Sequence, residues 1–433
     1  MLQIALLLFG AEFIRGKAHY LWGVGLLWCF IGIFIFIDGI DGILFFPIHL
    51  FGFLLLLESL ITLSVASSGI GTQKTILFFK GGLFLFCALV ILINQTYSNA
   101  LLSAMFGFVF FITGLFVVAS AWIVRFPGWQ LILLWGVIEM LFAFFLFTHH
   151  QATISYFIGF VMIGSGFGCL KLAFRARHIQ RGTSIFEFMS PLPVPLKKKG
   201  AITLITNTSS FPHLNRATEQ DITLTIHIWT PEGSANQRPI RRPIINRYIA
   251  AVDSEGVIST GHASLELYPH LYISLYPAED IDRSPSEFFR LLKATADNNV
   301  PGRFLSNYQT EASEWCESDR QIVFNNYNYA SLLSFWEKYN QHPVYNLTYR
   351  NCSSSVAYGL EAALDGVLSM QKRSDFIGVL NVLCMPELWI AAQIRRRALM
   401  MAWTPGLIMD YARALQAIVH PVPVPWYKRL LNR

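Results

Sequence analysis

Cys352 stands at a point where a reactive thiol would be useful, because a helix is predicted to begin there. Apolar residues at Val356, Leu360 and Leu364 recur at helical spacing, which indicates one buried face of a helix. The side chain of Asn351 can cap that helix, and Cys352 then lies in its first turn. Free amide groups and the positive end of the helix dipole favour a thiolate there, so the pKa of this thiol should fall.

A lone cysteine is more often a packing residue than a nucleophile, so the prediction needs a histidine in the right place. Two segments upstream, Val257–Leu267 and Leu271–Pro277, alternate apolar and polar residues and are joined by a short turn, which is typical of a β-hairpin. One side of the hairpin is wholly apolar and should face the core. Facing pairs on the other side are His262 with Tyr276, Ser264 with Ser274, and Glu266 with Tyr272.

A histidine on a strand and a cysteine at a helix start can form a thiolate–imidazolium pair. The helix end lowers the pKa of the thiol, the sheet holds the ring, and a third polar group orients the far ring nitrogen. For the third group the chain offers Ser274, Tyr276 or His270. Ser274 has the better geometry and His270 the better chemistry, so the choice stays open. The backbone amide of Cys352 would contribute to an oxyanion hole, and no cofactor is expected.

Three short segments resemble the circularly permuted papain-like enzymes, a group that includes permuted NlpC-type hydrolases and relatives of lecithin:retinol acyltransferase. They are Gly261–Leu265 (GHASL), Tyr272–Pro277 (YISLYP) and Arg350–Ser353 (RNCS). The resemblance covers about residues 220 to 370. It implies an α+β domain with Cys352 as nucleophile and His262 as general base. The expected activity is that of a thiol peptidase or an acyl hydrolase or acyltransferase, acting on a protein, peptide or lipid-acyl substrate.

The amino-terminal part of the chain has the composition of a membrane domain. Of 27 acidic residues, only five (Glu12, Asp38, Asp41, Glu58 and Glu139) precede Gly182. Apolar runs of about 20 residues are long enough to cross a bilayer. Six such runs are predicted: Tyr20–Gly42, Ile43–Ala66, Thr75–Asn94, Ala100–Trp122, Gly128–Thr148 and Ile154–Phe174. The lipid bilayer is therefore an expected partner.

The connections between the predicted spans alternate in charge, because DGIDG, NQTYSN and THHQAT carry no Lys or Arg. The opposite side carries Arg15, Lys17, Lys74, Arg125, Lys171, Arg175, Arg177 and Arg181. By the positive-inside rule both termini of the chain face the cytoplasm, and a bacterial inner membrane is the expected location. The six cysteines include no CxxC pair, so neither a zinc site nor a disulfide framework is indicated. Nucleic-acid binding is not expected, since the net charge of +6 comes mostly from residues beside the membrane.

The predicted spans form three hairpins with an internal repeat of about 55 residues. Residues 15 to 180 resemble the HdeD family of six-span bacterial membrane proteins, with the best segment from Gly128 to Phe147. The resemblance implies a role in acid or stress resistance. It also supports an alternative in which the membrane domain is the functional part and the soluble domain only binds. A homo-oligomer is compatible with either function.

Among the charged residues within the predicted spans, Glu58, Lys80 and Glu139 stand out. Such groups are costly in hydrocarbon unless they are paired or hydrated. They form either a proton-sensitive cluster or a structural pair such as Glu58 with Lys80. Glycines at Gly107, Gly114, Gly159, Gly164, Gly166 and Gly168 are expected at close helix contacts.

The predicted organisation is multi-domain: an all-α six-helix transmembrane bundle plus an α+β permuted papain-like domain. The bundle spans residues 1–181, a basic Pro-rich linker 182–200, the papain-like domain 201–372, and amphipathic membrane-proximal helices 373–433. Residues 1–17 are expected to be an interfacial lead-in rather than a cleaved signal. Further elements of the soluble domain are predicted at Ile222–Trp229 (strand, with His227 facing solvent), Ser284–Asn298 (helix), Arg320–Phe324 (strand), Tyr329–Tyr339 (helix) and Tyr345–Tyr349 (strand).

Overall fold

The computed structural model describes most of the chain. The described residues are 1–41, 48–66, 72–93, 95–126, 128–149, 152–176, 222–234, 240, 242–248, 251–252, 254, 258–279, 281 and 290–421. The predicted linker at 182–200 lies outside them. Two compact units are present, each described below by itself. The helix unit comprises the described residues of Arg15–Trp122 and Trp129–Ile179, and the sheet unit those of Met1–Ile14, Ile123–Gly128 and Gln180–Val422.

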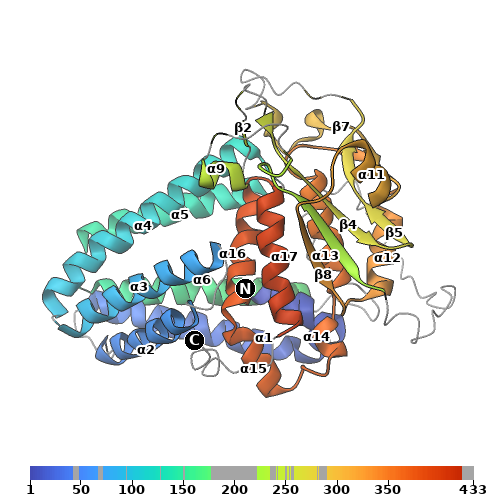
Figure 1. Cartoon of the computed structure of the whole chain (residues 1–433). Coiled ribbons are helices and arrows are strands. Elements are labelled where there is room, and N and C mark those ends of the chain that lie inside the picture. Colours follow the sequence, from blue (N-terminus) through green and yellow to red (C-terminus); the bar gives the residue numbers. More distant parts are fainter. Residues whose placement is uncertain are drawn as a thin grey trace. The chain divides into compact units, whose positions relative to one another are not determined.

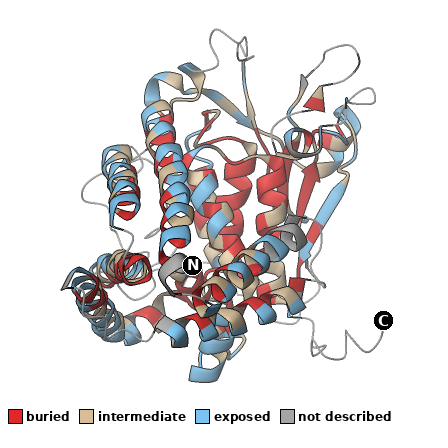
Figure 2. Ribbon diagram, turned by 90° about the vertical axis from the view of Figure 1, so that its left-hand side faces the viewer, coloured by how far each residue is buried: buried red, intermediate tan, exposed pale blue. Residues whose placement is uncertain are grey.

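The helix unit is built from long apolar helices. They are α1 (Leu2–Asp41, from Arg15 onward), α2 (Ile48–Ala66), α3 (Thr72–Ile93), α4 (Gln95–Val124), α5 (Trp129–Thr148) and α6 (Thr153–Ala176). Large apolar side chains such as Phe30, Phe79 and Phe167 are exposed on them, as on helices that face lipid. Figure 2 shows the exposed residues as blue stretches along such helices.

Four of the six predicted spans are long and apolar enough in the described residues to cross a membrane. They are Gly16–Ile40, Asn99–Val124, Trp129–Thr148 and Thr153–Phe174. Helices also occupy the other two predicted positions, but their apolar parts are shorter, at Gly52–Ser64 in α2 and Phe78–Ile93 in α3. The helices therefore fit a multi-pass membrane protein.

Glycines let the helices of this unit approach closely. A Cβ on Gly114 would lie 2.8 Å from the Gly136 carbonyl oxygen, and one on Gly159 would lie 2.8 Å from that of Gly32. The predicted contact at Gly168 is wrong, because nothing lies within 4 Å of its Cβ position. The other predicted glycines have close neighbours on other helices, so small residues here serve packing.

Lys80 and Glu58 form the predicted pair within the helix unit. The Lys80 Nζ lies 2.6 Å from Glu58 Oε1 and joins α3 to α2. Nearby polar groups also bond across this helix pair, since the Ser59 hydroxyl donates to the Gly81 carbonyl at 2.8 Å. These contacts connect the two helices that would be least able to span a membrane alone.

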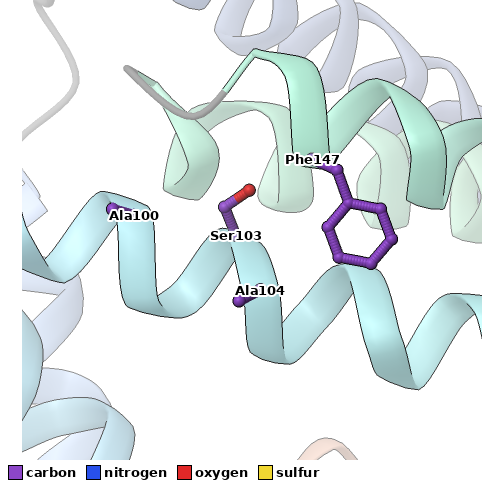
Figure 3. Close-up of a pocket in the computed structure, with 4 residues that line it drawn as sticks. All are labelled: Ala100, Ser103, Ala104 and Phe147. Atoms are coloured by element: carbon purple, nitrogen blue, oxygen red, sulfur yellow. The ribbon is translucent and has the colours of Figure 1, made fainter.

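A shallow hollow of about 150 Å³ lies between α4 and α5 and is lined by Ala100, Ser103, Ala104 and Phe147 (Figure 3). The Ser103 hydroxyl points toward α5, where it donates to the Leu146 carbonyl. Its polar group is thus already used in helix packing. The hollow offers no further chemistry from these residues.

The sheet unit contains a four-stranded antiparallel sheet in the order β5-β4-β1-β8. Its strands are β1 (Leu224–Trp229), β4 (His262–Leu267), β5 (Leu271–Ile273) and β8 (Arg320–Phe324). A three-stranded sheet has the order β6-β7-β9, from β6 (Leu275–Pro277), β7 (Val300–Phe304) and β9 (Val344–Tyr345). Strands β2 (Ala251–Val252) and β3 (Ile258–Ser259) pair separately. The predicted register is confirmed at Glu266 opposite Tyr272.

Helices cover the apolar face of the four-stranded sheet. α13 (Cys352–Ala363) contacts β4 and β5, and α17 (Pro405–Val419) contacts β1, β4 and β8. α12 (Tyr329–Tyr339) packs on α13, and α9 (Pro243–Tyr248) on α17. Residues of α13 are buried along most of its length, and Figure 2 draws the central helices of this unit in red. On the opposite, polar face the short helix α11 (Tyr308–Glu314) reaches the sheet through Glu311.

The amino-terminal segment of α1 belongs to the sheet unit. Ile4, Leu7 and Leu8 are fully buried, and the Leu7 carbonyl accepts a hydrogen bond from the Gly366 amide at 2.9 Å. The helix breaks at Gly10, whose φ is 82°. The segment predicted to be an interfacial lead-in is therefore a buried part of the fold, because its apolar side chains pack against protein.

The C-terminal part folds as α14 (Val367–Met370), α15 (Phe376–Cys384), α16 (Pro386–Met400) and α17. Red helices α16 and α17 lie side by side in Figure 1 and contact each other. Arg395 of α16 is buried, and its guanidinium bonds Glu361 of α13 at 2.7 and 3.0 Å. The part predicted to form amphipathic membrane-proximal helices thus contributes Arg395 to the protein core.

Two predicted elements differ in extent. The strand predicted at Tyr345–Tyr349 ends at Tyr345, because Asn346 and Arg350 close a turn with backbone bonds of 3.0 and 3.2 Å. The start of the helix predicted at Ser284 lies outside the described residues, and by Ala296–Asn298 the chain forms only a 3-10 turn. Strand β8 and helix α12 have the predicted bounds, and β1 begins two residues later than expected.

Candidate active site

Asn351 fixes the start of α13 and therefore the position of Cys352. Its side-chain oxygen accepts from the Ser354 amide at 2.8 Å, and the Ser354 hydroxyl accepts from the Asn351 amide at 2.8 Å. These two bonds form a capping box. The Asn351 amide group also donates to the carbonyls of Leu347 and Trp403, so the cap is held from both sides. Cys352 is the first residue of the helix, as predicted.

Arg350 secures the turn that leads into this helix. Its side chain is buried and donates to the carbonyls of Tyr339 and His342 at 2.7 and 2.6 Å. The guanidinium also lies over the ring of Tyr339, 4.0 Å from the ring centroid. The segment before Cys352 is thereby tied to the end of α12, which limits the movement of the thiol.

His262 is the first residue of β4 and is buried. Gly261 precedes it with φ 68°, and a Cβ there would lie 2.3 Å from the Trp229 carbonyl oxygen. Only glycine is accommodated at that position without displacing the strand. The glycine before His262 is therefore required by the backbone conformation and by the close carbonyl of Trp229 at the start of β4.

Cys352 and His262 lie together, and each shifts the pKa of the other. Burial raises the pKa of the Cys352 thiol, but the charge and hydrogen bond of His262, the Ser353 hydroxyl and the Ala263 amide together lower the pKa below its ordinary value. Burial lowers the pKa of His262, whereas Cys352 and then Glu311 raise it to about 9. Both shifts favour the thiolate–imidazolium pair at neutral pH.

Glu311 is the third member of the group. Its Oε1 lies 3.1 Å from Nε2 of His262, and the carboxylate is 2 % exposed. The carboxylate also accepts hydrogen bonds from Tyr276 at 2.6 Å and from Tyr272. Burial raises the pKa of Glu311, but the bonds from His262 and the two tyrosines lower it below its ordinary value, so the carboxylate is charged.

Ser274 lies between the ring and the carboxylate. Its Oγ is 2.9 Å from His262 Nε2 and donates to Glu311 Oε1 at 3.1 Å. Because Nε2 is engaged by Glu311 and Ser274, Nδ1 is the ring nitrogen that remains for Cys352. The tautomer and orientation of the ring are thus set from the side opposite the thiol.

Aromatic rings flank the histidine. Tyr276 stacks on the ring of His262 with centroids 4.3 Å apart. Trp315, just after α11, meets the same ring edge-on at 6.4 Å and stacks on Trp229 at 5.8 Å. Trp229 is buried, whereas Trp315 is 42 % exposed. Trp315 therefore forms an accessible apolar rim beside the pair.

His227 does not face solvent, so this prediction is wrong. It is 3 % exposed, its Nε2 lies 3.0 Å from Glu266 Oε2, and its Nδ1 lies 3.1 Å from the Ser318 hydroxyl. Its ring stacks on Tyr308, the first residue of α11, at 4.0 Å. The polar face of the sheet is covered by α11, and that covering buries the side chain that simple alternation assigned to water.

The structure joins some of the predicted site residues and separates another. Cys352, His262 and Ser274 lie together, and Tyr276 stacks on the histidine. His270 is exposed in the turn after β4, where its ring faces Tyr329 at 6.2 Å; it is not part of the group.

Sequence reasoning missed Glu311 and Trp315. The available signal was the run Asn307 to Trp315, NYQTEASEW, in which Asn307 caps a helix by accepting from the Thr310 amide at 2.7 Å. A capped helix with an acidic residue in its first turn was recognisable. Its position over the hairpin was not, because no periodicity relates α11 to the strands.

The arrangement brings a thiol, an imidazole and a buried carboxylate to one place, and these groups are able to serve as nucleophile, base and orienting group. The amide of Cys352, at the first position of α13, has no partner within the helix ladder and can donate to a developing oxyanion. Among the residues that the structure describes, no group of three or more His, Cys, Asp or Glu side chains could hold a metal ion. Comparisons with protein-family models, with curated proteins and with solved structures find no match to this chain.

Proposed function

We propose that this protein is a membrane-anchored thiol hydrolase that cleaves acyl or peptide bonds with Cys352 as nucleophile and His262 as general base. The observation that carries the proposal is the placement of His262 between Cys352 and Glu311, with the pKa of the thiol lowered and that of the imidazole raised to about 9. Groups whose pKa values are moved apart in this way at one spot are typical of catalytic sites.

In the first half of the reaction the Cys352 sulfur attacks the carbonyl carbon and a C–S bond forms. Negative charge passes to the carbonyl oxygen, where the amide of Cys352 can donate to it. The imidazolium of His262 then gives its proton to the departing amine or alcohol. The products of this half are a thioester on Cys352 and a neutral His262.

In the second half His262 removes a proton from water, and the resulting hydroxide attacks the thioester carbon. The C–S bond breaks, the acid product leaves and the thiolate is restored beside a protonated ring. Glu311 stays ionised throughout and stabilises the imidazolium, with Ser274 holding the ring in place. Glu311 therefore takes the orienting role for which the sequence offered Ser274, Tyr276 and His270.

The membrane arrangement that we propose keeps the six spans, with both termini in the cytoplasm of a bacterial inner membrane. Support for six comes from helices at all six positions, including the pair α2 and α3 joined by Lys80 and Glu58. Support for the orientation comes from the basic residues on alternate connections. We also propose that the helix unit is related to HdeD-like membrane proteins and the sheet unit to permuted papain-like enzymes.

The test is labelling of the purified full-length protein with a thiol-reactive acyl probe. Cys352→Ala should abolish the label, whereas Cys384→Ala, which removes an exposed cysteine of α15, should leave it intact. His262→Ala should slow labelling by about 10²- to 10⁴-fold, the range for loss of a general acid–base group. Labelling at full rate in Cys352→Ala would contradict the proposal. The alternative would then be a stress-resistance membrane protein whose soluble domain only binds.

A further inference from the structure

Helix α15 presents large apolar side chains to its surroundings. Phe376 is 81 % exposed, Ile377 66 % and Leu380 49 %, and Met370 of the preceding helix α14 is 64 % exposed. These four residues, here called the α15 patch, lie within eleven residues of sequence. Soluble surfaces rarely gather side chains of this size, and such patches mark interaction sites.

The α15 patch cannot be explained as part of a membrane span. α15 and α16 together have the length and hydropathy of a span, but they are bent by 60° at the break between them. Arg395 of α16 is buried in its ion pair with Glu361 of α13, and Tyr411 of α17 donates to the same carboxylate at 2.9 Å. α16 is therefore a core helix of the sheet unit, and α15 alone extends from it.

The link before α15 is fixed to the same core. The Arg373 guanidinium donates to the Ile418 carbonyl at 2.7 Å, and the Gln371 side chain to the Val419 carbonyl at 3.1 Å, both near the end of α17. Asp375 then caps α15 by accepting from the Gly378 amide. In Figure 1 α15 (orange) is drawn where the chain turns from α14 toward α16. The exposed side chains are thus held on an anchored element.

Charge beside the patch selects the kind of partner. Lys372 is exposed and Arg373 half-buried, and they lie three and two residues before Asp375, which caps α15. Basic side chains next to exposed apolar ones match a surface of anionic headgroups over acyl chains. The same polypeptide contains helices fit to cross a bilayer, so a lipid surface is an expected partner of this chain.

We propose that α15 inserts its apolar side chains into the interface of an anionic lipid bilayer and docks the sheet unit there. Phe376 and Ile377 enter the boundary between headgroups and acyl chains, while Lys372 contacts lipid phosphate. Insertion of this kind reaches about 5–10 Å into the bilayer. The inference does not depend on the catalytic proposal, since it involves no residue of the Cys352 group.

The test is photo-crosslinking from α15 in the full-length protein. Phe376→p-benzoylphenylalanine keeps an aromatic ring at the most exposed position, and the protein is reconstituted in vesicles of phosphatidylcholine with phosphatidylglycerol. After irradiation we expect a phospholipid adduct on the peptide that contains residue 376, detected by mass spectrometry. The matched control is Tyr268→p-benzoylphenylalanine, because Tyr268 is an aromatic residue 63 % exposed in the turn after β4. The adduct at 376 should exceed that at 268 by about tenfold.

The contribution of charge is measured by adding Lys372→Gln to the crosslinking variant. Its adduct yield should fall about fivefold in vesicles that contain phosphatidylglycerol, since one basic residue near an anionic surface contributes about that factor. In phosphatidylcholine alone the two variants should give equal yields. Equal lipid adducts at 376 and 268, or crosslinks from 376 only to protein, would overturn the proposal. Thiol labelling of Cys352 in the same samples reports separately on the catalytic hypothesis.

Discussion

The carboxylate of Glu311 lies 3.1 Å from the Nε2 of His262, although the two residues come from different layers of the sheet unit. One belongs to α11 and the other to the first position of β4. The carboxylate also accepts hydrogen bonds from the hydroxyl groups of Ser274, Tyr276 and Tyr272. A buried charge with this many donors is stable as an anion, and it fixes the imidazole from the side that faces away from Cys352.

Glu311→Gln should therefore weaken the pair without removing either partner. The amide still accepts hydrogen bonds but carries no charge, so the pKa of His262 should fall below about 9 and the pKa of Cys352 should rise toward its ordinary value. The rate of Cys352 alkylation by iodoacetamide, measured against pH, should shift its midpoint upward. Glu314→Gln, an exposed change on the same helix, serves as control and should leave the midpoint in place.

If Cys352 and His262 catalyse the proposed hydrolysis, the two pKa shifts determine its pH dependence. On the acid side activity is lost when the Cys352 thiolate takes up a proton, which occurs below the ordinary thiol pKa because that pKa is lowered. On the basic side activity is lost as His262 loses its proton, near pH 9. A profile of kcat/KM against pH should be bell-shaped. Its two limbs report apparent pKa values of the coupled Cys352–His262 pair rather than of either residue alone. A single rising limb that continues past pH 9 would count against an imidazolium in the active form.

The pairing of Cys352 with His262 was predictable from the sequence because each residue is positioned by local rules. Asn351 caps a periodic helix, which places Cys352 in the first turn, and strict alternation in a hairpin places His262 beside Tyr276 and Ser274. Glu311 could not be predicted in this way. Its position depends on how α11 packs across the sheet, and neither periodicity nor capping contains that information.

Alternation also failed where a second layer covers the strand. His227 has the sequence context of a solvent-facing residue on β1, yet α11 and the segment after it bury its ring. Similarly, Arg395 lies in the part predicted to form amphipathic membrane-proximal helices, but its ion pair with Glu361 of α13 buries it in the core. In both cases a single partner distant in sequence decides the environment.

His227→Phe should preserve the stack on Tyr308 and remove the bonds to Glu266 and Ser318. We expect a loss of roughly 1–3 kcal/mol in the free energy of unfolding, the cost of leaving buried polar groups without partners. Chemical denaturation of the purified protein measures the loss. Because His227 stacks on Tyr308 at the start of α11 and bonds Ser318 in the segment after the helix, the alkylation midpoint of Cys352 should also move slightly upward.

The pH dependence of this loss has a defined sign. Burial, the largest effect, lowers the pKa of His227 in the folded protein below the ordinary value of 6.5. At pH values between the folded pKa and 6.5, the unfolded chain therefore binds more protons than the folded protein. The contribution of His227 to stability is therefore present above pH 6.5 and is lost as the pH falls through the folded pKa. The stability difference between the parent protein and His227→Phe should shrink on acidification. A difference that grows toward low pH would show that the folded state prefers the charged ring.

Arg395 and Glu361 allow the clearest test of the core that supports Cys352, since Glu361 lies on the same helix as the thiol. Arg395→Met should cost roughly 3–5 kcal/mol of unfolding free energy, because it leaves the buried Glu361 carboxylate without a cation. Combining it with Glu361→Gln should recover much of that loss, as the remaining groups are then neutral. Arg396→Met, the adjacent exposed arginine, is the matched control and should change stability little. Losses that simply add in the double variant would mean that the two side chains do not interact, and α16 would have to be held to α13 by its apolar contacts alone.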